Sequence, residues 1–197
     1  LNEASNWKGE FKDLPKYDET DGHEIVYTIK EVKIEGYNSA TSGTAQTGFT
    51  ITNTITGKVS IPVTKTWVGK KGTSAKIRLY ADGAEVANVA LNADNNWQHT
   101  FANLEKYKDG KEIKYTIKED AIENYKSEIT GDAASGFKIK NTNTEKVNVP
   151  VKKQWVGKAT DKVEVKLLAD SKETDKTLTL NEASNWKGEF KDLPKYD

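Results

Sequence analysis

Apolar and polar residues alternate along most of the chain, and the apolar positions are rich in β-branched and aromatic side chains. Because the side chains of a strand point alternately to its two faces, this pattern predicts strands with one buried face. Between residues 58 and 146 it predicts seven strands, over 60–67, 75–81, 85–91, 96–102, 112–119, 125–130 and 136–143. Seven short strands separated by turns indicate an antiparallel β-sandwich.

Turn residues support these strand boundaries. Asp82-Gly83 lies between two strand patterns, and Asp109-Gly110 precedes the fifth. Asp-Gly is typical of tight hairpin turns because both residues tolerate positive φ. The polar run Asp94-Asn95-Asn96 predicts a further break.

The chain repeats itself at two levels. Residues 1–18 return letter for letter at residues 180–197, which gives a period of 179 residues (180 − 1). Looser copies lie 88 residues apart, such as Tyr27-Thr-Ile-Lys-Glu31 and Tyr115-Thr-Ile-Lys-Glu119. We therefore expect three parts: residues 1–57 as the C-terminal part of one unit, 58–146 as a complete unit, and 147–197 as the N-terminal part of a further unit. Tandem units of this kind are typical of structural arrays.

Neither end segment has enough strands to close a sandwich alone. We therefore expect neighbouring repeats as partners, with adjacent copies completing the partial units. Because Leu1 falls inside a repeat, we expect any signal peptide and wall-anchoring signal to lie outside this stretch.

The composition argues against several classes of function. Thirty basic and thirty acidic residues give a formal net charge of zero without a run of like charge, so we expect neither nucleic acid nor a membrane as partner. The chain has no Cys and only two His, His23 and His99, which excludes disulfides and thiolate or His-rich metal sites. We expect no metal and no cofactor.

One polar residue interrupts each of three core-facing rows. Lys65, Glu119 and Asn141 fall in phase with the apolar residues of their predicted strands, and the end segments repeat the same triplet. The counterparts are Lys153, Glu31 and Asn53.

This triplet has a specific chemistry. Burial favours the neutral forms of a lysine and a glutamate, which are an amine and a protonated acid. A neutral Lys65 can attack the side-chain carbonyl of Asn141 while Glu119 donates to its oxygen and relays a proton to departing ammonia. The product would be a Lys–Asn isopeptide bond, formed once because folding itself brings the reactants together.

The sequence resembles the Cna B-type domains of Gram-positive surface adhesins, above all collagen-adhesin B repeats. The resemblance rests on Val63-Thr-Lys65-Thr-Trp67, on Leu104–Tyr107 through Gly110 to Tyr115-Thr-Ile-Lys-Glu119, and on Phe137-Lys-Ile-Lys-Asn141-Thr. It implies an all-β fold of tandem seven-stranded Greek-key sandwiches of the inverse immunoglobulin-like type. It also implies that Lys65 and Asn141 form the bonded pair and that Glu119 is the catalytic acid, with Glu31, Asn53 and Lys153 as counterparts.

The resemblance implies a structural stalk on the bacterial cell wall, outside the cell, that projects a ligand-binding head. The head would be a separate domain that binds a host matrix protein. The alternative is that the repeats themselves bind a host extracellular-matrix protein. We do not expect a turnover enzyme, because the only reactive constellation consumes itself.

Other residues have competing interpretations. Trp67, Trp97 and Trp155 could form a carbohydrate platform, but their inward phase favours core packing. Asp18–Gly22 resembles part of a calcium loop but lacks its ligand pattern, which favours a simple turn. Lys65 alone could be an edge residue whose ammonium reaches water, and Glu119 could pair with Lys118 or Lys140 at the surface.

Overall fold

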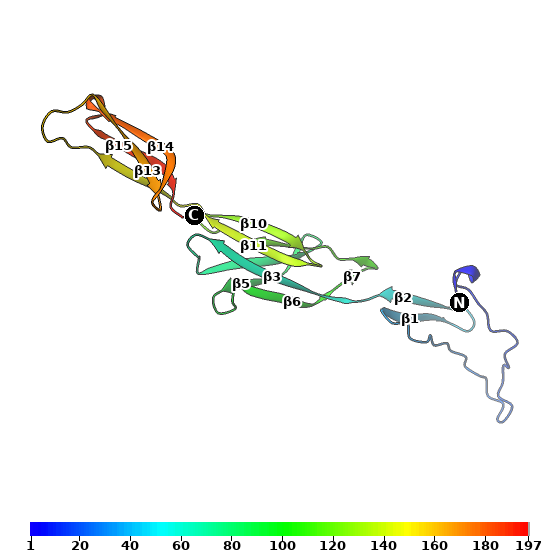
Figure 1. Ribbon diagram of the computed structural model, residues 1–197. Helices are drawn as coiled ribbons and strands as arrows, with labels where there is room; N and C mark the ends of the chain where they lie inside the picture. The colour runs from blue at the N-terminus through cyan, green and yellow to red at the C-terminus, as the bar shows by residue number, and fades with distance from the viewer. Residues whose placement is uncertain (197) are drawn as a thin grey trace. The chain divides into compact units, whose positions relative to one another are not determined.

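The computed structural model describes residues 1–196, and strands dominate it (Figure 1). Two single 3-10 turns, Glu3–Ser5 and Glu182–Ser184, are its helical segments over that range. The chain groups into two compact units, Leu1–Lys58 with Glu105–Glu112, and Val59–Leu104 with Ile113–Asp197. The boundaries expected from the repeats, after residues 57 and 146, stay a prediction. Among the described residues no helix has the length and apolar character to cross a membrane.

Seven strands between residues 58 and 143 form two sheets. The first sheet has the order β10-β11-β3-β6 and the second has the order β5-β4-β9. Their bounds are β3 (Lys58–Val68), β4 (Ser74–Ala81), β5 (Ala84–Asn92), β6 (Gln98–Glu105), β9 (Tyr115–Glu119), β10 (Tyr125–Asp132) and β11 (Gly136–Asn143). The predicted all-β, immunoglobulin-like sandwich is confirmed.

The first and last strands of this sandwich are neighbours. β3 and β11 pair in parallel, with Val63 opposite Phe137, Lys65 opposite Ile139, and Trp67 opposite Asn141. Because opposite residues of paired strands share a face, the inward-facing residues of both strands line the same side of the sheet.

The core lies between the two sheets. Its buried apolar side chains come from strands of both and have at most 9% of their surface exposed. They are Ile61, Val63, Ala75, Ile77, Leu79, Leu91, Phe101, Tyr115, Ile117, Phe137 and Ile139. The alternating pattern therefore predicted the buried faces of β3, β9 and β11 correctly.

The turns follow their residue types. Asp82 and Gly83 have φ of 49° and 86°, as the predicted hairpin between β4 and β5 requires. The fourth strand begins later than predicted, because Asn96 and Trp97 also have positive φ and belong to a turn. The predicted strand 112–119 is interrupted: its first residue belongs to a hairpin of β7 (Tyr107–Lys108) and β8 (Lys111–Glu112).

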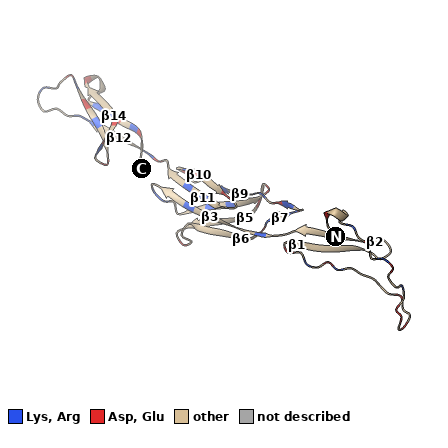
Figure 2. Cartoon of the chain, turned by 45° about the vertical axis from the view of Figure 1, so that its right-hand side comes forward, with Lys and Arg blue, Asp and Glu red and all other residues tan. Residues whose placement is uncertain are grey.

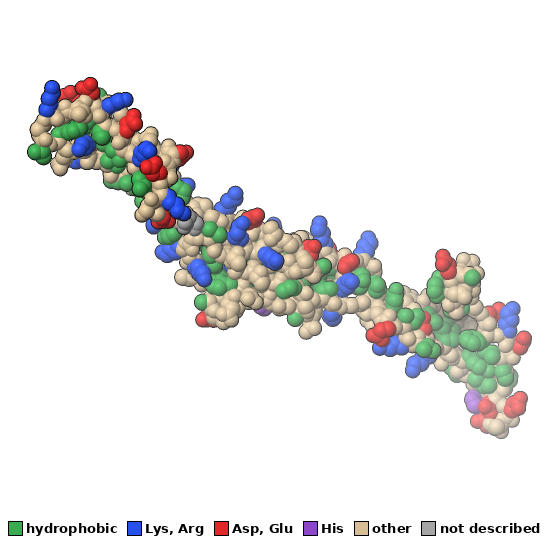
Figure 3. Space-filling view, in the orientation of Figure 1, with side chains coloured by type: hydrophobic (Ala, Val, Ile, Leu, Met, Phe, Trp, Pro, Cys, Tyr) green, Lys and Arg blue, Asp and Glu red, His purple; other side chains and the backbone are tan. Residues whose placement is uncertain are grey.

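The N-terminal segment forms a hairpin of β1 (Tyr37–Thr44) and β2 (Gly48–Ile55). Residues 27–31 are not in a strand, although the matching residues 115–119 form β9. β9 pairs with β4. The counterpart of β4 at a spacing of 88 residues is β13 (Lys162–Ala169), which belongs to the other compact unit. Val26 and Val32 are 85% and 86% exposed, and hydrophobic side chains gather on the visible face of this part in Figure 3.

The C-terminal segment contains two antiparallel pairs. β12 (Lys146–Lys152) pairs with β15 (Lys187–Pro194), and β13 (Lys162–Ala169) pairs with β14 (Lys172–Asn181). Basic and acidic residues are distributed along all parts of the chain (Figure 2), as the balanced composition predicts.

Candidate functional site

Lys65 lies in β3 with its side chain in the interior of the sandwich. The side chain has no exposed surface, and its ammonium nitrogen lies 4.2 Å from the centre of the Trp67 ring. Its backbone N–H donates to the carbonyl of Trp97 at 2.9 Å, which ties β3 to the turn before β6. Lys65 is therefore a core residue, and the alternative of an edge lysine that reaches water is wrong.

Trp67 covers the lysine from one side. Its ring packs edge-on against Trp97 and Tyr125, with ring centres 5.1 and 5.0 Å apart. Both tryptophans pack against the core cluster, so core packing is confirmed for Trp67 and Trp97. The aromatic cluster excludes water from the lysine and leaves it with a π-face as one neighbour.

Glu119 reaches the lysine from the opposite sheet. It is the last residue of β9, where it pairs with Ile77 of β4, and its side chain is 2% exposed. Its Oε1 lies 3.1 Å from Nζ of Lys65, so the two form a buried ion pair between the sheets. The surface pairing with Lys118 or Lys140 is therefore wrong for Glu119.

Asn141 completes the group from β11. It is 1% exposed. Ile139 of β11 lies opposite Lys65, and Asn141 is the next inward-facing residue of β11 after Ile139. Neither polar atom of its amide has a hydrogen-bond partner within residues 1–196. The three residues predicted from strand phase thus lie on neighbouring inward-facing positions of β3, β11 and β9.

The site leaves polar atoms buried without well-formed hydrogen bonds. Nζ of Lys65 and Oε1 of Glu119 are at ion-pair distance, yet neither makes a hydrogen bond of good geometry among the described residues. Such atoms are costly, and in native structures they call for an explanation. A stability role alone is a poor explanation, because buried ion pairs often contribute little net stability.

The electrostatics favour a nucleophilic lysine. Burial lowers the pKa of Lys65 below its ordinary value of 10.5, and the nearby Glu119 carboxylate opposes that shift. Transfer of a proton from the ammonium to the neighbouring carboxylate would leave Lys65 as a neutral amine, which is the nucleophilic form of a lysine. The arrangement can therefore present an amine, an acid and a carboxamide to one another.

The end segments reproduce parts of this geometry. In the N-terminal segment, Asn53 donates a hydrogen bond of 2.8 Å to Glu31, whose other carboxylate oxygen is buried without a partner in the described structure. The structure thus brings Glu31 and Asn53 together in one compact unit and holds Lys153 in the other.

Lys153 has the surroundings of Lys65. Its ammonium lies 4.4 Å from the Trp155 ring centre, and its N–H donates to the carbonyl of Trp186 at 2.9 Å. Trp155 also packs edge-on against Trp186, with ring centres 5.2 Å apart. The local environment of the lysine is therefore built by the repeat sequence itself.

Two side-chain groups were not predicted from the sequence. Arg78 bridges Glu85 and Asp120 on the outer side of β4, a contact between strands that no local pattern reveals. Asp18, Asp21 and His23 bring their ligand-type atoms within 4.8 Å of one another, in a stretch that the sequence analysis interpreted as a simple turn. Asp18 accepts from Thr20 and Asp21 from His23, so these side chains already stabilise the turn.

Comparison with known proteins agrees with the repeat pattern. The family model described as "Cna protein B-type domain" matches residues 1–54, 61–142 and 149–197. The collagen adhesin of Staphylococcus aureus is 40% identical over 213 aligned residues, which include all of this chain but only 17% of the adhesin.

Two crystal structures from the collagen-binding protein of S. aureus are similar. Its pair of B repeat units (B1B2) is 38% identical, with 100% of this chain and 55% of that one covered and a TM-score of 0.49. Its single B repeat unit (B1) is 29% identical, with 72% and 80% covered and a TM-score of 0.41.

Proposed function

The chain belongs to the family of Cna protein B-type domains, and from that premise we propose that it is a stalk segment of a bacterial cell-surface adhesin, stiffened by autocatalytic Lys–Asn isopeptide bonds. The observation that carries the proposal is the buried Lys65–Glu119 ion pair beside the unpartnered amide of Asn141. The proposal is supported because an amine and a carboxamide on neighbouring strands, with an acid on the facing sheet, have the chemistry that the bond requires in a dry core.

The reaction begins with proton transfer from Lys65 to Glu119. The neutral Nζ attacks Cγ of Asn141 and forms the new C–N bond while the Glu119 carboxyl group donates a hydrogen bond to Oδ1. A proton then moves from the attacking nitrogen through Glu119 to Nδ2, the Cγ–Nδ2 bond breaks, and ammonia leaves. The amide keeps one hydrogen, ammonia carries three, and the proton first given up by Lys65 stays on Glu119.

The bond has a mechanical consequence. In a tandem array, tension enters the central repeat at β3 and leaves it at β11, and these are the two strands that the bond joins. Force then passes from residue 65 to residue 141 without extending the chain between them. In each such repeat, only the few residues outside the crosslinked loop can extend under load. Low extensibility of this kind is what a stiff stalk requires.

The other kind of repeat would react in the same way. Residues 180–197 repeat residues 1–18, so residues 147–197 and 19–57 supply complementary parts of one kind of unit. Lys153 from the former and Glu31 and Asn53 from the latter would then meet between neighbouring copies in the array. The local environments of Lys153 and of the Glu31–Asn53 pair support this assignment.

The stalk role places ligand binding elsewhere in the full protein, outside the cell and at the wall surface. The relative named collagen adhesin extends well beyond the part that this chain matches. A separate head domain that binds a host matrix protein therefore fits a stalk of repeats.

Intact mass of the full 197-residue chain tests the proposal. We expect the folded chain to be lighter than its sequence mass by one ammonia, and Glu119→Ala to restore the full mass. Glu128→Ala is the matched control, because Glu128 also pairs with a lysine of β11, Lys140 at 2.7 Å, but on the surface. A wild-type chain of full mass, or a Glu119→Ala chain that still lacks ammonia, would contradict the mechanism.

A further inference from the structure

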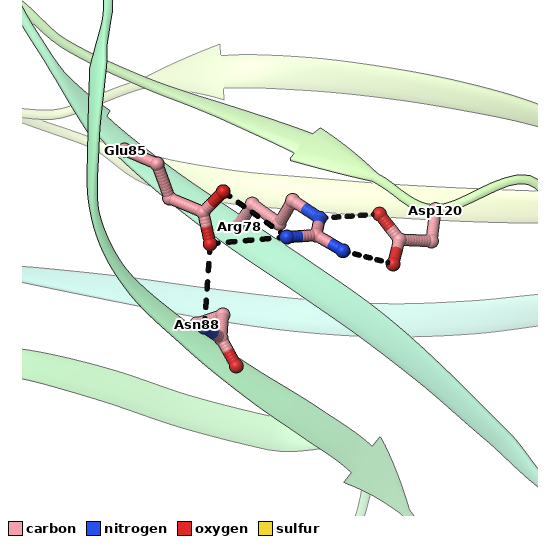
Figure 4. Close-up of polar contacts among 4 residues, drawn as sticks. All are labelled: Arg78, Glu85, Asn88 and Asp120. Atoms are coloured by element: carbon pink, nitrogen blue, oxygen red, sulfur yellow. Dashed lines mark hydrogen bonds and ion pairs between the residues drawn. The ribbon is translucent and has the colours of Figure 1, made fainter.

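Arg78 binds two carboxylates on the outer face of the three-stranded sheet (Figure 4). Its Nε and Nη2 donate to the two oxygens of Asp120 at 2.6 and 2.8 Å, which is a two-point fork. Its Nη1 donates to Glu85 at 3.1 and 3.2 Å, and Glu85 also accepts from Asn88. Hydrogen bonds from Arg78 lower the pKa of Asp120, so this carboxylate is charged at neutral pH.

The fork binds the residue that immediately follows the proposed catalytic acid. β9 ends at Glu119, whose side chain points into the core, and the side chain of the next residue, Asp120, is 41% exposed. In the strand order β5-β4-β9, β9 lies at the edge of its sheet, so its end is held from the β4 side. The N–H of Asp120 also donates to the carbonyl of Lys76 at 3.0 Å. Together these bonds fix the backbone at the residue from which the Glu119 side chain departs.

In an inference that rests on the proposed function, we propose that Arg78 and Asp120 are positioning residues for the crosslinking reaction. Their two-point hydrogen bond holds the Glu119 carboxyl group next to Lys65. A fixed carboxyl group matters because proton transfer and polarisation of the Asn141 carbonyl both need hydrogen-bond contact. A group at the frayed end of an edge strand would sample many positions, and a displacement of about 1 Å can cost a factor of about 100 in rate.

The chain contains a natural comparison. At the spacing of 88 residues, Arg78 corresponds to Lys166, Glu85 to Glu173, and Asp120 to Val32. Lys166 keeps the pairing with Glu173, at 2.8 Å, but the position after Glu31 has no carboxylate. Arginine therefore occurs at position 78, where a second carboxylate can accept its hydrogen bonds, and lysine occurs at position 166, where the corresponding residue is a valine. A guanidinium can bind two planar groups at fixed angles, whereas an ammonium acts as a point charge.

This comparison suggests an experiment that distinguishes the two-point hydrogen bond from an ordinary surface ion pair. If only charge mattered, Lys at position 78 would serve as well as Arg. If the fork positions Glu119, Lys at position 78 fails because it cannot bind both oxygens of Asp120 in one plane.

The rate of ammonia loss in the newly made 197-residue chain tests this inference. Cell-free synthesis is stopped, aliquots are quenched in denaturing acid, and intact mass gives the crosslinked fraction over time. Each rate is normalised to the fraction of chain that resists brief proteolysis, so that a variant that folds poorly is still scored on its folded molecules.

We expect Asp120→Asn and Arg78→Lys to slow crosslinking of folded chains by about 10- to 100-fold. Arg78→Lys combined with Asp120→Val, the residues found at Lys166 and Val32, should be equally slow. Glu85→Gln is the matched control, because it removes an ion pair from the same arginine and leaves the fork intact, and its rate should equal that of the wild type.

Two results would overturn the inference: a wild-type rate in Arg78→Lys, or equal slowing in Glu85→Gln and Asp120→Asn. Failure of the proposed function would look different, because the wild-type chain itself would then keep its full mass at all times.

Discussion

Asn141→Ala removes the carbon that Lys65 is proposed to attack while the Lys65–Glu119 ion pair stays in place. The bond would close a loop of 76 residues (141 − 65). By the relation for covalent crosslinks, closing that loop lowers the entropy of the unfolded chain enough to stabilise the fold by about 4.5 kcal/mol. For a unit of this size, losing that stability lowers the melting temperature by roughly 20–35 °C.

The same substitution also deletes a buried side chain, and Asn143→Ala measures that cost separately. Asn143 is 8% exposed on the same strand, and like Asn141 it has an amide nitrogen without a partner in the described structure. It also accepts a hydrogen bond from the N–H of Glu145 at 2.8 Å, so its removal is not a mild perturbation. The difference between the two alanine variants therefore isolates the crosslink.

Differential scanning calorimetry of the 197-residue chain, with intact mass measured on the same samples, provides the assay. We expect Asn143→Ala to lack one ammonia and to melt moderately below the wild type, and Asn141→Ala to keep its full mass and melt far below both. If the wild type has lost ammonia and the two variants still melt within a few degrees of each other, the loop-entropy reasoning is refuted.

Three further predictions concern force, pH and backbone. In a single-molecule pulling experiment, Glu119→Ala should release about 270 Å more chain than the wild type, because 76 residues extend at about 3.6 Å each. Equal extension in both chains would contradict a bond between β3 and β11. In Asn141→Ala, Lys65 stays titratable. The free energy of unfolding should rise with pH between the lowered pKa of Lys65 in the folded chain and 10.5, because in that window the unfolded chain binds one more proton than the folded chain. Chemical denaturation should show no such rise once Lys65→Met is added. Gly83→Ala should cost about 1 kcal/mol for its φ of 86°. Gly131→Ala should cost about 1–3 kcal/mol more, because a Cβ there would lie 2.1 Å from the carbonyl oxygen of Gly136. Equal costs in denaturant unfolding would show that this close approach does not affect stability.

The strands and the site residues could be predicted because both depend on a period of two. Ile61, Val63 and Lys65 alternate with more exposed residues, so their shared burial follows from strand geometry. Strand phase also gave the inward direction of Glu119 and Asn141. The 88-residue spacing then repeated each position and strengthened the prediction.

Features that depend on contacts between distant segments were not predictable. Trp97 adopts a φ of 59° in a turn, against its strand preference, and its ring packs on Trp67 thirty positions earlier (97 − 67). The fork between Arg78 and Asp120 depends on the pairing register of β4 and β9. With thirty basic and thirty acidic residues, the sequence offers too many candidate ion pairs for this one to stand out.

The unsatisfied atoms of the core explain why the site would react rather than remain as an ion pair. Before reaction, a charged pair and a carboxamide occupy a space with almost no water, and four of their polar atoms lack well-formed hydrogen bonds within residues 1–196. The proposed reaction would replace the ammonium and the carboxylate by a neutral amide and a neutral acid, and would thereby remove the desolvation penalty of two charges. The protonated Glu119 can then donate to the new amide carbonyl. Ammonia leaves the site, which makes the reverse step improbable in dilute solution. The same burial that destabilises the unreacted triad would thus drive Lys65, Glu119 and Asn141 towards the proposed bond.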